Sequence, residues 1–324
     1  MNISYSQRYL ENTVASNHSH DDFSTIITTA MIVSIFSTIG SVLILVILAI
    51  MRKAAGPFAK LIAMISLSDL IFGIGNILEG FMKVSREDEC RILFAFENLG
   101  FLSSVFWTNC FAHFVLRNLE DGPQDSINRY FKRYVVTSFS LSIILAAIMF
   151  PLQAVAIHEK TQTCWMDFAT VDDDWIDIIF MVLPCTISIC YCSVVYVFIV
   201  RSIKKLGEGI HLEMVVYPSI LILCLTPWIV ASFYMKITQS EPSDFFVLLT
   251  YIFWNSQGLL NAIAYGLSPR TRAYLRSFCT GRTYSGISLE NYEIGSRESE
   301  NNLSVSSSTR NLSFIRADSS LLSK

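Results

Sequence analysis

The chain has 324 residues, of which 52% are hydrophobic and 16% are charged, and its formal net charge is −3. Because a soluble domain carries about 25% charged residues, this chain is too apolar to cover a water-exposed surface. The small net charge gives no reason to expect a nucleic-acid partner. The composition therefore indicates an integral membrane protein.

The chain begins with a polar tail, residues 1–22, which carries glycosylation sequons at Asn2 and Asn17. No signal peptide is visible in this tail, so the first apolar run is expected to direct membrane insertion. The sequons fit an extracellular tail.

Long apolar runs follow the tail. A membrane helix needs about 20 apolar residues, and five runs without charged residues meet this length: 23–51, 134–157, 178–200, 214–235 and 245–269. Two weaker runs, 61–81 and 91–119, contain Asp69, Glu79, Glu97 and His113. The sequence therefore predicts an all-α membrane protein with a seven-helix bundle over residues 23–268 and its two ends on opposite sides.

The loops differ in their content of Lys and Arg, which sets orientation because basic loops stay in the cytoplasm. Most of the basic residues fall on one side, and those expected near the inner helix ends are Arg117, Lys132, Arg133, Lys204, Lys205 and Arg270. The N-terminus is thus expected outside and the C-terminus in the cytoplasm, in a multi-pass protein of the plasma membrane.

Of the eight cysteines, only Cys90 and Cys164 fall on the predicted outer side, where the compartment is oxidising. A disulfide is expected because neither has another outer partner, and the alternative is two free thiols. The bridge would pin the loop between helices four and five across the outer end of helix three.

Motifs for chemistry are missing from the sequence: it has no nucleophile elbow, no HExxH and no phosphate-binding loop. A retinal protein would need a lysine in helix seven for its Schiff base, and residues 245–269 contain none. We therefore expect no enzyme activity, no catalytic residues, no metal and no cofactor.

Polar side chains within the spans form stripes. Placing a charged side chain at the bilayer centre costs about 3 kcal/mol. Charged side chains in membrane spans therefore usually face the bundle interior and have a functional role. Spacings of three and four residues place them on one helix face. The stripes are Ser66, Asp69, Gly73, Asn76 and Gly80 in helix two, Asn98, Asn109 and His113 in helix three, and Trp254, Gly258, Asn261 and Tyr265 in helix seven. They predict one shared polar interior; the alternative is hydrogen bonding that only holds helices together.

Prolines interrupt helices five and six at Pro184, Pro218 and Pro227, where each removes a backbone hydrogen bond and allows a kink or hinge. We interpret a set of interior residues as a conformational switch: Asp69, Asn76, Asn109, His113, Pro218, Pro227, Trp228, Asn255, Asn261 and Tyr265. A second set, nearer the outer side, is the candidate ligand site: Glu79, Glu97, Asn98, Phe101, Trp165 and Trp254.

Pro269 ends the seventh run and begins a basic segment, residues 269–279, which is expected to form an amphipathic helix on the inner membrane surface. Cys279 at its end is a candidate palmitoylation site, with a free thiol as the alternative.

Residues 280–324 are rich in Ser and are expected to be a disordered cytoplasmic tail. Phosphorylation there would add charge and recruit kinases and arrestin-like regulators.

Several short motifs carry a family resemblance: "SQGLLNAIAYG" at residues 256–266, "ISLSDLIFG" at 65–73, and the Tyr217-Pro218 pair. Together with the placement of Cys90 and Cys164, they resemble the cyclic-AMP-receptor-like group of seven-helix G-protein-coupled receptors. That group is typified by slime-mould chemoattractant receptors and is related to the secretin-like branch. The chain departs from rhodopsin-like receptors, because it has "HFVLRNLED" in place of Asp-Arg-Tyr and "CLTPW" in helix six.

The resemblance implies a receptor that passes an extracellular signal to a heterotrimeric G protein. Acidic residues in the loop before helix five mildly favour a cationic or peptide ligand, with a solvated loop as the alternative. Two rival interpretations remain open. One is a transporter or cation channel that uses Asp69, Glu79 and Glu97, and the other is a scaffold that binds neither ligand nor G protein.

Overall fold

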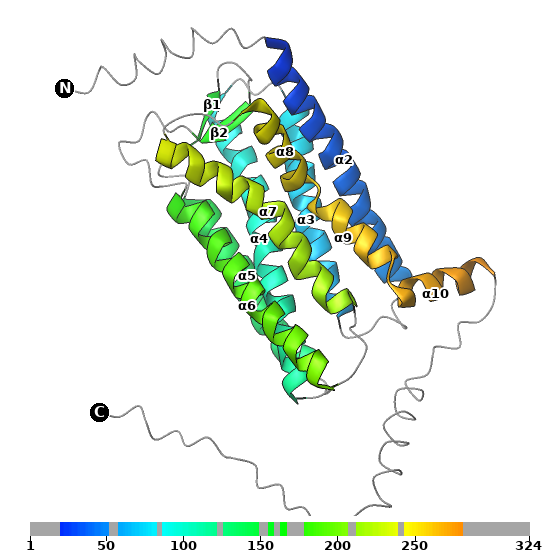
Figure 1. Ribbon diagram of the computed structural model, residues 1–324. Coiled ribbons are helices and arrows are strands. Elements are labelled where there is room, and N and C mark those ends of the chain that lie inside the picture. The colour runs from blue at the N-terminus through cyan, green and yellow to red at the C-terminus, as the bar shows by residue number, and fades with distance from the viewer. Residues whose placement is uncertain are drawn as a thin grey trace, which may run out of the picture. The chain divides into compact units, whose positions relative to one another are not determined.

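The computed structural model describes residues 20–51, 58–82, 86–121, 126–148, 155–158, 163–166, 178–206, 212–238 and 243–280. The chain divides into two units, Met1–Ala273 and Tyr274–Lys324. The first unit is almost entirely helical and carries one two-stranded sheet (Figure 1). The predicted glycosylation sites Asn2 and Asn17 and the predicted tail beyond residue 280 lie outside the described residues.

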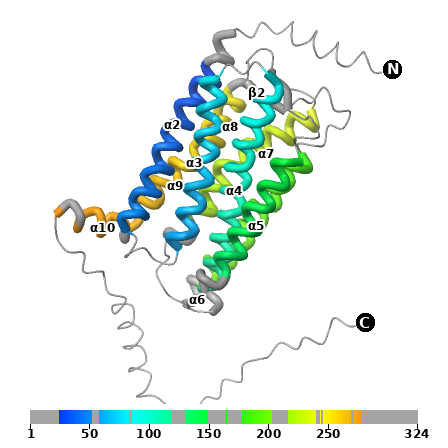
Figure 2. The backbone as a smooth tube through the Cα atoms, turned by 180° about the vertical axis from the view of Figure 1, so that it is seen from behind, coloured from blue at the N-terminus to red at the C-terminus, as the bar shows by residue number. Residues whose placement is uncertain are grey.

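Six of the seven predicted spans are present as helices that are long and apolar enough to cross a membrane. They are α2 (His20–Ile50), α3 (Ala59–Phe81), α4 (Glu87–Asp121), α5 (Ser126–Ile148), α6 (Leu183–Leu206), which continues from the π-helical turn η1 (Ile178–Val182), and α7 (Leu212–Thr238). Seen from behind, α3 lies between α2 and α4, and it packs against both (Figure 2).

The seventh predicted span is divided. The sequence predicted one continuous helix, but the structure has α8 (Asp244–Asn255) and α9 (Gln257–Gly266), which meet at Ser256. The backbone N–H and the hydroxyl of Ser256 both donate to the carbonyl oxygen of Phe253, at 3.2 and 3.0 Å. This tightened turn ends α8 because the Phe253 carbonyl is satisfied from three residues away.

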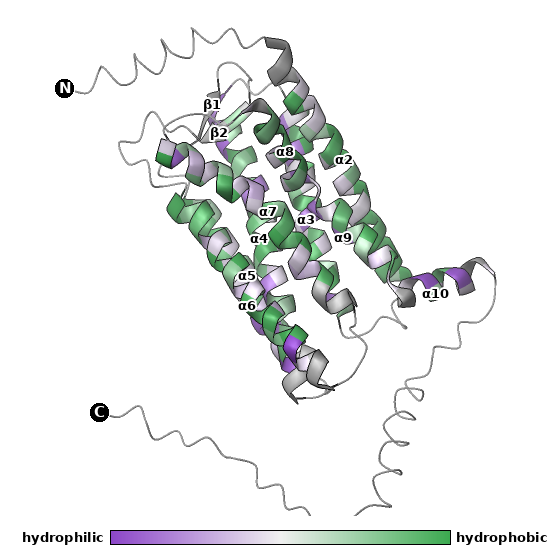
Figure 3. Ribbon diagram, in the orientation of Figure 1, coloured by the Kyte–Doolittle hydropathy of each residue, from purple (hydrophilic) through white to green (hydrophobic). Residues whose placement is uncertain are grey.

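The outward faces of the helices are apolar (Figure 3). On α2, Phe36 is 55% exposed, Leu43 53% and Ile39 50%, and α5 and α6 expose Ile143, Ile187 and Val194 in the same way. Contiguous exposed apolar surface of this extent is rare in soluble monomers but suits contact with lipid tails. The surface is therefore compatible with an integral membrane protein.

Glycines allow two pairs of helices to approach closely. A Cβ on Gly100 of α4 would lie 2.9 Å from Phe72 Cα and 3.0 Å from the Ile71 carbonyl carbon, both backbone atoms of α3. Where α9 crosses α2, a Cβ on Gly258 would lie 2.7 Å from Ser37 Oγ and 2.9 Å from its carbonyl oxygen. Gly258 thus allows α9 to pack closely against α2.

Gly266 does not have that role. A Cβ added there would meet no atom within 4 Å, so no close helix contact requires a glycine at this residue. Gly266 is the last residue of α9, beyond the point where the helix packs tightly.

The helix α10 (Pro269–Cys279) starts where the sequence predicted a basic helix. Ser268 caps it, since its hydroxyl accepts from the Thr271 N–H at 3.2 Å and donates to Thr271 Oγ1 at 2.9 Å. Pro269 occupies the first helical position, where its missing N–H costs nothing. Arg272 and Arg276 are exposed one turn apart, whereas the side chains of Arg270 and Cys279 lie outside the described part.

Candidate functional site

A β-hairpin is attached to the end of the bundle where α4 begins. Its strands, β1 (Val155–His158) and β2 (Thr163–Met166), are antiparallel, with Ile157 opposite Cys164. A disulfide joins Cys164 to Cys90, with 5.2 Å between the Cα atoms, which confirms the predicted pairing. Both cysteines are buried.

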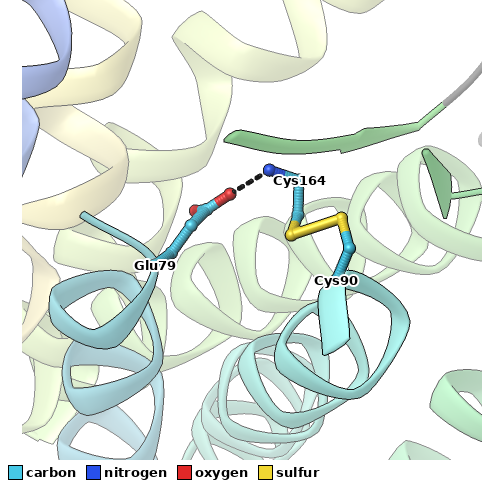
Figure 4. Close-up of a disulfide and its surroundings, with 3 residues drawn as sticks. All are labelled: Glu79, Cys90 and Cys164. Carbon is cyan, nitrogen blue, oxygen red and sulfur yellow. Dashed lines mark hydrogen bonds between the residues drawn. A yellow bond between two sulfur atoms is a disulfide. The ribbon is translucent and has the colours of Figure 1, made fainter. Parts of the chain in front are cut away.

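Glu79, near the end of α3, gives the hairpin a second attachment. The N–H of Cys164 donates to Glu79 Oε1 at 2.6 Å, and Figure 4 shows this carboxyl group directed at the strand beside the disulfide. The hairpin is thus held to α4 by a covalent bond and to α3 by a hydrogen bond.

Glu97 of α4 lies beside Glu79, and we call these two residues the outer carboxyl pair. Glu97 comes near Glu79 because it packs against Gly75, one helical turn before Glu79 on α3. Glu97 reaches this place because Gly75 has no side chain: a Cβ on Gly75 would overlap Glu97 Cγ and lie 3.3 Å from its Cα.

An aromatic cluster, comprising Phe72, Phe101, Trp228 and Trp254, begins one helical turn further along α4. Phe101 stacks on Trp254 with ring centroids 4.1 Å apart, and Trp228 lies 4.5 Å from Trp254. Phe72 meets Trp254 edge to face at 6.1 Å. Because these rings come from α3, α4, α7 and α8, the cluster couples four helices through large, rigid contacts.

A buried hydrogen-bond network follows one turn beyond the cluster, and we call it the Asp69 network. Ser104 Oγ donates to Asp69 Oδ1 at 2.5 Å, Asn261 Nδ2 donates to Asp69 Oδ2 at 2.8 Å, and Gln257 Nε2 donates to Ser104 Oγ at 2.8 Å. All four residues are buried. Both carboxyl oxygens of Asp69 are therefore satisfied, by α4 on one side and α9 on the other.

Ser104 was not among the residues singled out from the sequence, whereas Gln257 was recognised as a polar side chain inside the seventh apolar run but was given no role. The signal for Ser104 was present, because it follows Glu97 and Phe101 at spacings of seven and three. Serine is common enough in membrane helices that this spacing alone did not select it.

The remaining predicted switch residues make separate contacts. Asn109 receives a hydrogen bond from Cys192 at 3.2 Å and donates to Ser188 at 2.8 Å, both on α6, while His113 meets the Tyr134 hydroxyl of α5 at 2.7 Å. The three stripes therefore do not form one polar interior. The reason is that α4 is packed against α3, α5, α6 and α7, so its faces meet different neighbours.

Other members of the set pair with α2 or with their own helix. Asn255 accepts from Ser34 at 2.9 Å, and the Tyr265 hydroxyl lies 4.0 Å from the Met51 sulfur. Asn76 donates only to the Phe72 carbonyl of its own helix, at 3.0 Å. These contacts tie α9 and α8 to α2 rather than to the Asp69 network.

Prolines lie inside α7 at Pro218 and Pro227 without ending the helix. Pro184 is the second residue of α6, directly after the π-helical turn. Trp228, next to Pro227, belongs to the aromatic cluster, so any bend of α7 at this proline moves a ring of the cluster.

The residues expected to face a G protein are only partly described. Lys132 and Arg133 are exposed near the start of α5, and Arg117 is half-buried near the end of α4. The side chains of Lys204, Lys205 and Trp165 lie outside the described part.

Among the described residues, no group of three or more His, Cys, Asp or Glu side chains could hold a metal ion. No protein-family model matches the chain, and no curated protein matches it either. The geometry of the outer carboxyl pair, the aromatic cluster and the Asp69 network therefore carries the functional argument.

Removing the Glu79 carboxyl tests the second attachment of the hairpin. A hydrogen bond to a carboxylate contributes about 1.5–3 kcal/mol, so Glu79→Ala should speed exchange of the Cys164 amide hydrogen about ten- to a hundredfold. Hydrogen-exchange mass spectrometry of nanodisc-embedded protein with the disulfide intact measures this. Glu87→Ala, which removes only the exposed pair with Arg91, is the control. Equal exchange in the two variants would contradict the attachment.

Proposed function

We propose that the chain is a seven-helix G-protein-coupled receptor of the cyclic-AMP-receptor-like kind. In this proposal α8 and α9 together make the seventh crossing, and the broken helix at Ser256 lies within it. The main support is a series of interhelical contacts whose α4 members, Cys90, Glu97, Phe101 and Ser104, follow one another along that helix. It begins at the disulfide-tethered hairpin and passes through the outer carboxyl pair and the aromatic cluster to the Asp69 network.

The mechanism is a population shift. A ligand that binds beneath the hairpin would favour one arrangement of the aromatic cluster, and Trp228 would carry this preference to α7. Since Pro227 and Pro218 weaken the backbone of α7, its inner half can move relative to α4. The Asp69 network, which joins α3, α4 and α9, would hold the resting arrangement.

The inner side would receive the G protein. Lys132 and Arg133 at the start of α5 are exposed and basic, as expected for a cytoplasmic surface. In this orientation α10 would lie on the inner membrane surface with Arg272 and Arg276 toward anionic headgroups, and the Ser-rich tail would be open to phosphorylation.

One observation favours the rival function of a cation transporter. Three acidic residues, Asp69, Glu79 and Glu97, lie along the α3–α4 interface, and intramembrane acids often mark ion pathways. Against this, both oxygens of Asp69 accept hydrogen bonds from neutral donors, which leaves that carboxyl group little freedom to bind a transported ion.

Nucleotide exchange separates the two functions. Nanodiscs containing the chain should accelerate GTP-analogue binding to at least one member of a panel of heterotrimeric G proteins, relative to empty nanodiscs, with and without a library of amines and peptides. Lys132→Ala/Arg133→Ala should reduce this acceleration without changing the unfolding temperature, because both side chains are exposed. Sodium or proton flux into liposomes without any exchange would overturn the receptor proposal.

A further inference from the structure

Three exposed basic side chains gather where α3 and α5 begin. The Lys60 ammonium lies 5.7 Å from the centre of the Phe131 ring, so the start of α3 lies beside the start of α5. Lys132 and Arg133 follow Phe131 directly, and all three cations are exposed. Neither Lys132 nor Arg133 pairs with an acidic side chain among the described residues. Their positive charge is therefore available to a partner outside the chain.

Apolar strips lead away from these basic residues on both helices. Residues three, four or seven positions apart share one face of a helix, and the exposed side chains follow this spacing. On each helix the basic residue comes first and large apolar side chains follow. We call this surface the α3–α5 face, and it comprises Lys60, Leu67 and Ile74 on α3 with Lys132, Val136 and Ile143 on α5.

The helix α4 holds the two strips in one surface. In Figure 2, α3, α4 and α5 follow one another, and α4 packs against both neighbours. Trp107 of α4 contacts Phe131 and Phe139 of α5, with ring centroids 5.9 and 5.8 Å apart. Phe139 lies between Val136 and Ile143 at spacings of three and four. The α5 strip therefore borders the contact with α4.

The strips match the depth of one bilayer leaflet. At a rise of about 1.5 Å per residue, the step from Lys132 to Ile143 covers about 16 Å and that from Lys60 to Ile74 about 21 Å. The hydrocarbon core of a bilayer is about 30 Å thick, so one leaflet contributes about 15 Å. When the apolar strips lie among acyl chains, the basic residues thus reach the level of the headgroups.

A lipid fits this face better than a second copy of the chain. Helix–helix interfaces in membranes favour small residues that let backbones approach, whereas both strips carry large exposed side chains such as Val136 and Ile143. Two copies that met symmetrically here would also bring their basic residues together, and like charges repel. An anionic headgroup neutralises the same charges.

We infer that the α3–α5 face binds a phosphoinositide-type phospholipid. Its phosphorylated headgroup contacts Lys60, Lys132 and Arg133, and its two acyl chains lie on the two apolar strips. A guanidinium pairs with phosphate through two parallel hydrogen bonds, and a lysine ammonium adds a point charge. Three cations from two helices suit a headgroup with several phosphate charges better than one with a single charge. The bound lipid joins the start of α3 to the start of α5.

The test uses phosphatidylcholine nanodiscs that contain the full chain and a small fraction of phosphatidylinositol 4,5-bisphosphate with a photoactivatable diazirine in one acyl chain. After irradiation, peptide mass spectrometry locates the label, which is expected on the exposed strips of α3 and α5. The unlabelled phosphoinositide should compete. Phosphatidylserine at equal total charge should compete much less, and so should soluble inositol 1,4,5-trisphosphate, because it has no acyl chains.

Lys132→Ala/Arg133→Ala should reduce labelling of the strips about thirtyfold at limiting lipid, the effect of two basic residues near an anionic surface. Arg201→Ala/Arg272→Ala is the matched control, since it removes the same charge from exposed positions on α6 and α10, and it should leave this labelling unchanged. If the first variant does not fold, the competition between lipids still decides the matter. Equal competition by phosphatidylserine or by inositol trisphosphate, equal loss in the two variants, or no label on α3 and α5 would overturn the inference.

This experiment needs no G protein and no fixed orientation, because a nanodisc offers lipid at both ends of the bundle. The nucleotide-exchange test can be run without the phosphoinositide, so the use of Lys132 and Arg133 in both proposals does not confuse them. Labelling of the strips without nucleotide exchange would uphold the lipid site and refute the receptor proposal, whereas exchange without labelling would do the reverse.

Discussion

Asp69→Ala is expected to lower the unfolding temperature strongly. The substitution leaves the Ser104 hydroxyl and the Asn261 amide without their acceptor inside the bundle, and each orphaned buried donor costs about 1–3 kcal/mol. Asp69→Asn should fall in between, because its amide oxygen can still accept from one of the two. Heating the nanodisc-embedded protein with a fluorogenic maleimide measures unfolding, since Cys185, Cys192 and Cys224 are buried until the helices separate.

Asn76→Ala is the control for this comparison. Asn76 lies on the same helix, but its amide donates only to the carbonyl of Phe72 one turn earlier, so its loss should change the unfolding temperature little. If Asp69→Ala and Asn76→Ala unfold at the same temperature, the Asp69 network does not hold α3, α4 and α9 together.

Gly100→Ala is expected to produce the second large loss of stability. The new methyl group would overlap the backbone nitrogen of Phe72 and lie 2.9 Å from its Cα. Backbone atoms cannot turn aside as a side chain can, so α3 and α4 must separate, at a cost of about 1–3 kcal/mol from overpacking. The aromatic cluster and the Asp69 network both span this interface, so both should be disturbed as well.

Gly266→Ala is the matched control, because its methyl group would meet nothing within 4 Å. Alanine is favoured over glycine in helices by up to about 1 kcal/mol, so this variant should be as stable as the unchanged chain or slightly more stable. The two glycine substitutions thus have opposite expected signs in the same maleimide assay. Equal destabilisation by both would show that the close contact of α3 and α4 at Gly100 is not what makes Gly100→Ala destabilising.

The three-dimensional contacts differ from the sequence expectation most clearly at α4. Asn109 and His113 share a face with Asn98 by spacing, yet they contact α6 and α5. Spacing gives only the relative angle between residues of one helix; it does not say which neighbour each angle meets. That assignment depends on how far α4 is rotated about its axis, and Gly100 fixes this rotation through its close contact with α3.

The break at Ser256 is a second feature that the sequence pattern did not predict. The run from 245 to 269 has no charged residue and is long enough for one helix, and the polar residues Asn255 to Gln257 inside it do not by themselves say that the helix ends there. The Ser256 hydroxyl can bond either to solvent or to the Phe253 carbonyl, and burial in the bundle selects the second.

By itself, the sequence predicted seven spans, six of which are membrane-length helices among the described residues, and it predicted the Cys90–Cys164 disulfide. Both depend on quantities that the chain carries locally, namely the length of its apolar runs and the number of cysteines on one side. Only the tertiary structure decided that Glu79 meets Glu97 and that Asp69 meets Ser104 and Asn261. These pairs join helices far apart in the sequence, and their contact depends on helix rotation and spacing, which the packing of small residues such as Gly75 and Gly100 sets.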